Sequence, residues 1–542
     1  MSRGNAMPMI ATVLPRAVLL SSLIFLGQLL LGTGAQAQVT AFKQAVAEAA
    51  AKDRDLAAFY QDNEFTGIWI GDSAADKARR VALFDAIRSA EDHGLPAARY
   101  DAEGLMAKLK SARSARDLGK AEVALSQVFL RLSRDMQTGV LVPGQVDDDI
   151  KRQVPYRERL SYLTNFVQSS PQAFFRALPP QSNEYARLMK EKLRLERLAD
   201  RGGWGPAVPA EAVKPGQSGA AVTALRDRLV AMGFLDRSAT QVYDENMLHA
   251  VQRFQLAHGL TPDGVAGPGT LAEINVPVQE RLKSLIVAME RERWINMPLG
   301  ERHILVNLTD FHARIIDDGA VSFETRVVIG KNTGDRRSPE FSDEMDHMVI
   351  NPTWHVPRSI AVGEYLPKMK RNPNAVSHLR LYNSRGQQVS RGAVNFAAYN
   401  ASNFPFSIKQ PPSQSNALGL VKFMFPNKYN IYLHDTPAKD LFGREVRAYS
   451  HGCVRVQKPF ELAYELLSKQ ETDPKRAFHS ILDTGRETRV NLEEVVPVHI
   501  IYRTAFTQAK GPVQYRRDVY GRDGRIWDAL DKAGVSLRAV QG

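Results

Sequence analysis

Cysteine is almost absent from this chain of 542 residues, which contains a single one, Cys453. One cysteine excludes an intramolecular disulfide and a zinc site built from several cysteines. Long hydrophobic runs are also missing. The most apolar stretch, residues 17–31, has about fifteen residues and is broken by two serines, a glycine and a glutamine, so it is short for a bilayer-spanning helix.

The composition excludes several classes of protein. Hydrophobic residues make up 44% of the chain and charged residues 24%, which is typical of a soluble globular protein. General disorder, a collagen-like fibre and a multi-span membrane protein are therefore excluded. The length predicts about three or four domains.

The charge is basic but carries little specific information. The chain has 71 Lys and Arg against 59 Asp and Glu, a formal net charge of +12. Such an excess is compatible with nucleic acid, with an anionic envelope surface, or with a basic protein that binds neither. The positive residues are spread over all regions without a dense block interleaved with aromatics, so we expect no nucleic-acid partner.

Residues 1–37 have the pattern of an export signal. Arg3 and Arg16 are the only charges, the apolar stretch follows, and an Ala-x-Ala cleavage pattern ends at Ala37. We expect cleavage there, and the alternative is a retained single-helix anchor. Both interpretations place the rest of the chain outside the cytoplasm, where a lone cysteine is either buried and inert or kept for its reactivity.

Residues 38–205 predict a helical scaffold domain. One apolar helix face has the spacing i, i+3, i+4, i+7, and its members are Leu125, Val128, Phe129 and Leu132. An aromatic cluster is expected in the core, made of Phe59, Tyr60, Phe65 and Trp69. No charged constellation in this region suggests chemistry, so a scaffold role is expected.

A Gly- and Pro-rich linker at 201–215 leads into a compact module at 212–276. Its apolar spacing predicts helices, and residues 263–267 form a glycine-bearing turn before a further short helix. Over residues 214–275 the order of these elements resembles the three-helix peptidoglycan-binding module of cell-wall enzymes. A generic helical linker domain is the alternative.

Residues 302–481 change to short β-rich runs separated by Gly, Pro and Asn, which predicts a β domain. A polar stretch at about 362–403 interrupts it, and we interpret this stretch as a lid insertion or as a mobile insertion without a catalytic part. Residues 482–542 are expected to form a C-terminal extension. The predicted fold class is therefore multidomain α+β, with a helical scaffold, a three-helix module and a β-rich domain.

The residues that suggest chemistry surround the only cysteine. His434 closes a strand-like run, and after fifteen intervening residues Ser450-His451-Gly452-Cys453-Val454-Arg455 follows. A free thiol has a pKa of about 8.5, and a nearby histidine can take its proton and hold the thiolate as an ion pair. Backbone N–H groups at Gly452 and Cys453 are candidates for binding an oxyanion, and Arg455 favours the thiolate or a substrate carboxylate. Taken singly, each residue also has an ordinary structural explanation.

This motif, together with residues 416–427 and His434-Asp435-Thr436-Pro437, resembles the signature of L,D-transpeptidases with a YkuD-type catalytic domain, in particular the large periplasmic subfamily. The resemblance implies Cys453 as nucleophile, His434 as general base and the backbone carbonyl near Asp435 as the group that orients the imidazole. Ser450, His451, Gly452 and Arg455 match residues that shape the site. No metal or organic cofactor is implied.

The activity implied by the resemblance is acyl transfer in cell wall biogenesis, in the periplasm. Cys453 would attack a tetrapeptide stem of peptidoglycan, and the amine of a neighbouring stem would complete a 3–3 cross-link. Water or a lipoprotein lysine as acceptor would instead make the protein an L,D-carboxypeptidase or an anchoring acyltransferase. Covalent inhibition by carbapenems is also implied. The alternative to an enzyme is a non-catalytic scaffold protein that binds peptidoglycan.

Overall fold

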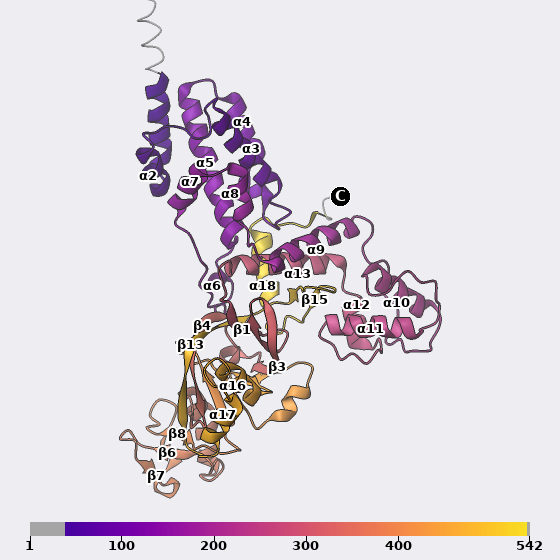
Figure 1. The fold of residues 1–542 in the computed structure, drawn as a ribbon, viewed down its shortest axis with the longest axis vertical. Helices are drawn as coiled ribbons and strands as arrows, with labels where there is room; N and C mark the ends of the chain where they lie inside the picture. The colour runs from indigo at the N-terminus through magenta and orange to yellow at the C-terminus, as the bar shows by residue number, and fades with distance from the viewer. Residues whose placement is uncertain (1–37, 539–542) are drawn as a thin grey trace, which may run out of the picture. The chain divides into compact units, whose positions relative to one another are not determined.

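The computed structural model describes residues 38–538, which fold as two compact units (Figure 1). The first unit comprises the described residues up to Ala90 together with Ala97–Asp135 and Tyr156–Leu178. The second comprises Glu91–Pro96, Met136–Pro155 and the described residues from Pro179 onwards. The export signal expected at 1–37 lies outside the described residues. Over 38–538, each helix falls short of the length or apolarity that a membrane span requires.

The first unit is helical, as expected for the scaffold domain. Its helices are α2 (Arg54–Asp62), α3 (Ala74–Arg88), α4 (Ala102–Ser111), α5 (Ala115–Thr138), α7 (Arg159–Gln168) and α8 (Pro171–Ala177). Trp69 is fully buried and stacks on Phe166, with ring centroids 5.2 Å apart. Glu122, which no sequence pattern singled out, is a buried carboxylate that accepts hydrogen bonds from the backbone N–H groups of residues 68–70 and from the Tyr60 hydroxyl. These hydrogen bonds connect α5 to the loop between α2 and α3.

The helices of the second unit include the small three-helix module. The module contains α10 (Ala220–Ala231), α11 (Glu245–Ala257) and α12 (Pro268–Ile274), and its core includes Leu225, Leu229, Val251 and Phe254. The remaining helices of this unit are α6 (Pro143–Val146), α9 (Asn183–Ala199), α13 (Val278–Trp294), α14 (Arg358–Ile360), α15 (Leu366–Arg371), α16 (Pro459–Leu467), α17 (Pro474–Leu482) and α18 (Arg522–Lys532).

A closed sheet dominates the β-rich part of the second unit. Its strands are β1 (Arg302–Asn307), β2 (His312–Asp317), β3 (Ala320–Gly330), β4 (Phe341–Ile350), β9 (Val421–Met424), β10 (Leu433–His434), β11 (Ala448–Ser450), β12 (Val454–Val456) and β13 (Thr488–Ile501). The order is β11-β3-β12-β10-β9-β4-β13-β1-β2, and an additional pairing of β2 with β3 closes the sheet on itself. Closure removes the unpaired edges that an open sheet would leave. The predicted multidomain α+β fold is confirmed.

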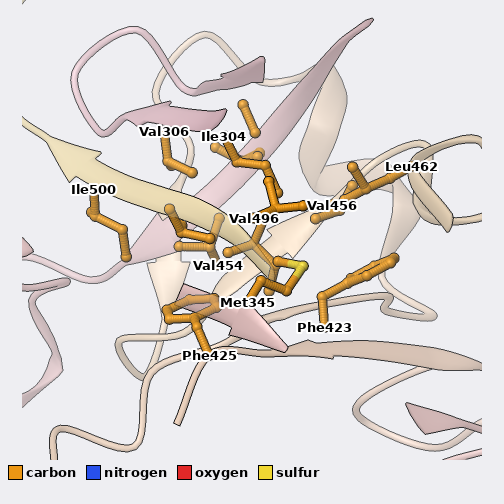
Figure 2. Packing of buried hydrophobic residues seen from close by; sticks show 14 of the residues in the cluster. Ile304, Val306, Met345, Phe423, Phe425, Val454, Val456, Leu462, Val496 and Ile500 are labelled. Atoms are coloured by element: carbon orange, nitrogen blue, oxygen red, sulfur yellow. The ribbon is translucent and has the colours of Figure 1, made fainter. Parts of the chain in front are cut away.

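The interior of this sheet is a continuous apolar core. Alternate residues of neighbouring strands point inward, as in a pleated sheet, and Figure 2 shows Val306, Phe423, Val454, Val456 and Ile500 packed there. All five are fully buried. Burial of each such side chain contributes about 1.5–3 kcal/mol to the stability of the fold. The core therefore determines which face of each strand points inward and which face can carry other side chains.

The sheet extends beyond the boundary predicted at residue 481. Strand β13, which was expected to belong to a C-terminal extension, pairs with β1 on one side and β4 on the other. The polar Glu493 and Glu494 and the proline at 497 break the alternating pattern, and the pairing shifts register across this segment. The alternation of polar and apolar residues therefore did not predict this strand. The segment from β14 (Ala505–Phe506) and β15 (Gln514–Tyr515) to α18 follows it.

The insertion forms a small subdomain with a core of its own. A four-stranded sheet has the order β5-β8-β6-β7, with β5 (Trp354–His355), β6 (Arg380–Tyr382), β7 (Gln388–Val389) and β8 (Ser407–Gln410). The buried cluster runs from Trp354 to Leu418, beyond both ends of the predicted 362–403. The flanking strands are too short to show a period in the sequence. Closure of this subdomain as a lid stays a prediction.

Candidate active site

Three neighbouring strands bring the predicted site residues to one face of the sheet. Strand β10 pairs in parallel with β12, which aligns His434 with Arg455, and antiparallel with β9, which aligns His434 with Lys422. Side chains alternate along a strand, so Tyr432 shares the face of His434, and Cys453 shares the face of Arg455.

The intervening residues Leu433 and Val454 point to the opposite face and are fully buried in the core. A slip of one residue in either strand would bury the polar set and expose these two side chains. The hydrophobic core therefore sets the register that brings the cysteine and the histidine into the same cavity.

The Cys453 thiol lies at the start of β12 and is enclosed by polar neighbours. Its Sγ lies 3.5 Å from the backbone carbonyl oxygen of Asn430, to which it donates. Burial raises the pKa of the thiol to about 11, although hydrogen bonds from Tyr432 and the charges of Arg455 and Lys422 partly oppose the shift. Tyr432 was not singled out in the sequence, because a tyrosine two residues before a histidine has no distinctive signature.

His434 is buried and oriented by a backbone carbonyl. Its Nδ1 donates to the carbonyl oxygen of Asp435 at 2.5 Å, which leaves Nε2 as the unprotonated nitrogen of the neutral ring. The Asp435 carboxylate is held in turn by the N–H of Leu420 and the ammonium of Lys439. Burial lowers the pKa of His434 to about 3, and the positive charge of Arg455 adds to the shift.

These two pKa shifts leave both side chains uncharged at neutral pH. The thiol with a pKa of about 11 keeps its proton, and the imidazole with a pKa of about 3 does not take it. Both shifts favour the uncharged side chains, and the ion pair expected from the sequence stays a prediction.

The turn before Cys453 is held by its own side chains. Ser450 Oγ donates to the carbonyl oxygen of Cys453 at 2.5 Å and accepts the N–H of Gly452 at 3.2 Å. Gly452 has φ +114°, a conformation that favours glycine. The Gly452 N–H expected at an oxyanion site is thus occupied. Among the described residues, the Cys453 N–H donates to no acceptor and remains open beside the thiol.

Three parts of the chain match models of known protein families. Residues 301–489 match the family model of the L,D-transpeptidase catalytic domain, YkuD. Residues 54–191 match a scaffold domain, and residues 218–274 match the family described as "Putative peptidoglycan binding domain". Residues 301–489 are a YkuD-type L,D-transpeptidase domain.

A curated relative and two solved structures are similar to this chain. A "Putative L,D-transpeptidase" of Haemophilus influenzae is 32% identical over 254 residues, which is 45% of this chain and only about half, 51%, of that protein. An L,D-transpeptidase from Xylanimonas cellulosilytica DSM 15894 is 16% identical with a TM-score of 0.16, covering 55% of this chain and 98% of its own. An L,D-transpeptidase from Stackebrandtia nassauensis is 14% identical with a TM-score of 0.20, covering 55% and 97%.

The face described above opens into a cavity of about 760 Å³ in the L,D-transpeptidase domain. The insertion contributes one wall of the cavity, including Trp354, Arg358 and Tyr365. At 760 Å³ the cavity has the size of a pocket for a small molecule or a short peptide. Over residues 38–538, no group of three or more His, Cys, Asp and Glu side chains is arranged to hold a metal ion.

His451 faces the insertion of the L,D-transpeptidase domain rather than the thiol. Its Nε2 lies 2.6 Å from Glu364 of the insertion, and Arg336 donates to the same carboxylate oxygen at 2.7 Å. Burial raises the pKa of Glu364, but the His451 hydrogen bond and the charges of His451 and Arg336 outweigh it, so the net pKa lies below its ordinary value. Glu364 was missed because its partner is 87 residues away in the sequence.

The cationic side chains of the site are Arg455 and Lys422. Burial lowers the pKa of both, while the charge of Cys453 in its thiolate form favours their protonated forms. Arg455 Nε is buried without a hydrogen-bond partner among the described residues. The charge of Glu487 also favours protonated Lys422, whereas no carboxylate contributes to the pKa shift of Arg455. Arg455 is therefore the cation better suited to meet an anionic group.

Proposed function

We propose that this protein is an L,D-transpeptidase that forms 3–3 cross-links between peptidoglycan stems through a Cys453 acyl-enzyme. The observation that carries the proposal is the placement of Cys453 and His434 on one face of β10 and β12, in a cavity of a YkuD-type domain. The open Cys453 N–H is the proposed oxyanion donor, in place of the occupied Gly452 N–H.

In the first step Cys453 Sγ attacks the carbonyl carbon of the third stem residue, and its proton passes to Nε2 of His434. The Cys453 N–H binds the resulting oxyanion. The intermediate then collapses, the bond to the terminal D-alanine breaks, and His434 returns the proton to the departing amine. The product of this step is a thioester on Cys453.

In the second step the side-chain amine of a neighbouring stem attacks the thioester. His434 removes a proton from that amine, the carbon–sulfur bond breaks, and the thiol is formed again. Lys422 and Arg455 are suited to hold a carboxylate of the donor stem. Water as the acceptor gives L,D-carboxypeptidase activity, and a protein lysine gives lipoprotein attachment.

The other parts of the chain fit an enzyme of the cell wall. We assign peptidoglycan binding to residues 218–274 on the basis of the matched family, and a supporting role to the helical scaffold. The pattern of an export signal at 1–37 supports a periplasmic location. Acylation of Cys453 by a carbapenem is expected, because a strained lactam carbonyl undergoes the same attack as the donor peptide.

The proposal is tested with purified protein, tetrapeptide muropeptides and mass spectrometry. The unmodified protein is expected to yield 3–3 dimers, and Cys453→Ala is expected to abolish them, because no other thiol exists in the chain. A carbapenem should add its mass to the unmodified protein and not to Cys453→Ala. Binding of both proteins to purified sacculi serves as the control for folding and for the peptidoglycan-binding module.

Each possible outcome separates the candidate functions. Monomers that have lost D-alanine, without dimers, would replace transpeptidation by carboxypeptidation. Binding to sacculi with no product and no carbapenem adduct would favour a non-catalytic scaffold. Full activity of Cys453→Ala would show that the nucleophile is assigned wrongly.

A further inference from the structure

The peptide bond between Gly452 and Cys453 carries the proposed oxyanion donor. Its carbonyl oxygen belongs to Gly452 and its N–H to Cys453, and the two groups point in opposite directions in one rigid plane. A hydrogen bond that fixes the carbonyl oxygen therefore also fixes the direction of the N–H. What holds the Gly452 carbonyl is consequently important for the chemistry.

Ser338 holds this carbonyl from the loop between β3 and β4. Its Oγ donates to the Gly452 carbonyl oxygen at 2.6 Å and accepts the N–H of Gly330 at 3.0 Å. Ser338 is fully buried, so its hydroxyl has no access to water as a replacement partner. The same loop approaches the turn closely, because a Cβ at Gly452 would lie 3.8 Å from the carbonyl oxygen of Arg337.

The C-terminal segment in turn holds Ser338. The Tyr520 hydroxyl accepts the Ser338 N–H at 3.3 Å and donates to the Gly330 carbonyl at 2.6 Å. Arg522 donates to the Ser338 carbonyl at 2.9 Å and forms an ion pair with Glu340 at 3.1 Å. Tyr520 and Arg522 are 1% and 0% exposed, so these contacts are shielded from water.

We infer that Ser338 is a positioning residue of the acylation step, and that Tyr520 and Arg522 of the C-terminal segment keep it in place. Ser338 touches neither substrate nor thiol. It acts through the Gly452–Cys453 peptide by aiming the Cys453 N–H at the carbonyl oxygen under attack. The inference rests on the proposed function, because it requires an oxyanion at Cys453.

The test compares two reactions of the same thiol. Acylation by a carbapenem passes through an oxyanion, whereas alkylation by iodoacetamide is a direct displacement that forms none. In Ser338→Ala we expect acylation to slow by about 10- to 100-fold, less than the cost of removing an oxyanion donor outright because the Cys453 N–H is misaligned and not lost, while alkylation at the same pH changes by less than about twofold. With tetrapeptide donor, kcat should fall while KM changes little.

Tyr520→Phe removes only a hydroxyl and provides the second variant. It should slow acylation by a smaller factor, roughly three- to tenfold, because the Ser338 hydroxyl keeps its hydrogen bonds to Gly452 and Gly330 and only the Ser338 N–H loses its acceptor. If Ser338→Ala does not fold, the inference is tested with Tyr520→Phe alone. Matched controls are Ser342→Ala, which removes a hydroxyl bonded to Arg152 and His499, and Tyr243→Phe, which removes one bonded to Gly264. Both controls should acylate at the normal rate.

The outcomes distinguish this inference from the proposed function. Acylation that is unchanged in both variants, or that falls in parallel with alkylation, would overturn the positioning role and leave the transpeptidase proposal intact. No acylation of the unmodified protein would overturn the proposed function and this inference with it.

Discussion

Cys453 and His434 illustrate how strongly burial controls a residue's chemistry. A thiolate or an imidazolium in this cavity would lose its hydration. Hydrogen bonds from Tyr432 and the nearby positive charges compensate part of that loss for the thiolate, whereas for the imidazolium the same charges add to it. Burial therefore moves the two pKa values apart, to about 11 for Cys453 and about 3 for His434. A thiol whose pKa is raised in this way is mostly protonated at neutral pH and therefore reacts slowly with electrophiles.

The reactivity of Cys453 toward iodoacetamide should therefore depend steeply on pH. With a thiol pKa of about 11 the rate should rise about tenfold for each pH unit between 7 and 10, because only the thiolate reacts. The adduct is measured by intact mass, and it reports on Cys453 alone since the chain has no other cysteine. N-acetylcysteine is the reference, whose rate levels off near its ordinary pKa. A rate independent of pH from 6 to 9 would instead reveal a thiolate–imidazolium pair.

At the scale of elements, β13 decides whether the catalytic sheet closes. It is paired on both sides, and Val498 and Ile500 on this strand are 1% and 0% exposed. Without it, β1 and β4 would each expose a row of unpaired backbone groups, and the core would be open to water. The site on β10 and β12 depends on this closure although β13 contributes no residue to the cavity.

A chain that ends at Arg486 should consequently not fold its L,D-transpeptidase domain. The lost burial on β13 alone is about 6–12 kcal/mol for four apolar side chains, comparable to the whole stability of a domain. Limited proteolysis should digest residues 301–486 rapidly and spare the helices of the first unit. A chain that ends at Arg538 is the control, and Val498→Asp in the full chain separates β13 from the later elements. A protease-resistant 301–486 fragment would contradict the expectation.

At the scale of the whole molecule, buried charges connect distant parts of the second unit. Arg291 of α13 pairs with Glu340 and with Asp523 of α18, both at 2.7 Å, and Arg522 joins the same Glu340. Removing one partner from such a buried network typically costs about 3–5 kcal/mol, because the other charge is left uncompensated. The network gives α13, the start of β4 and α18 one fixed arrangement.

Buried histidines should make the molecule sensitive to acid. His499 accepts from the Ser342 hydroxyl and donates to the Leu299 carbonyl, and burial lowers its pKa to about 4. Between pH 6.5 and about 4 the unfolded chain binds a proton at this position and the folded chain does not, so this residue lowers the free energy of unfolding as the pH falls. The contribution is about 1.4 kcal/mol for each pH unit in that window.

His499→Gln should therefore flatten the pH dependence of unfolding. Urea titrations at several pH values between 4 and 7 measure the free energy of unfolding, and the slope against pH is compared with the unmodified protein. The lost hydrogen bonds should lower the free energy of unfolding by the same amount at every pH, so they do not affect its slope against pH. His249→Gln changes an exposed side chain and is the control. Equal slopes for His499→Gln and the unmodified protein would refute the assigned protonation state.

The sequence by itself determined the class of each domain and the chemistry-bearing residues. Helical spacing, the glycine turn and the change to β-rich runs are local patterns, and they sufficed for the multidomain α+β fold. The motif around Cys453 named the thiol, the histidine and the serine of the turn, because these residues lie within twenty positions of each other in the chain.

The tertiary structure alone decided everything that depends on partners far apart in the sequence. Strand register put Tyr432 and Lys422 beside the thiol, and the turn geometry occupied the Gly452 N–H. Burial shifted the pKa values of Cys453 and His434 toward their neutral forms. Glu364, Ser338, Tyr520 and β13 became visible only through contacts across long stretches of chain, since hydrogen bonding and desolvation depend on distance in space and not on order in the sequence.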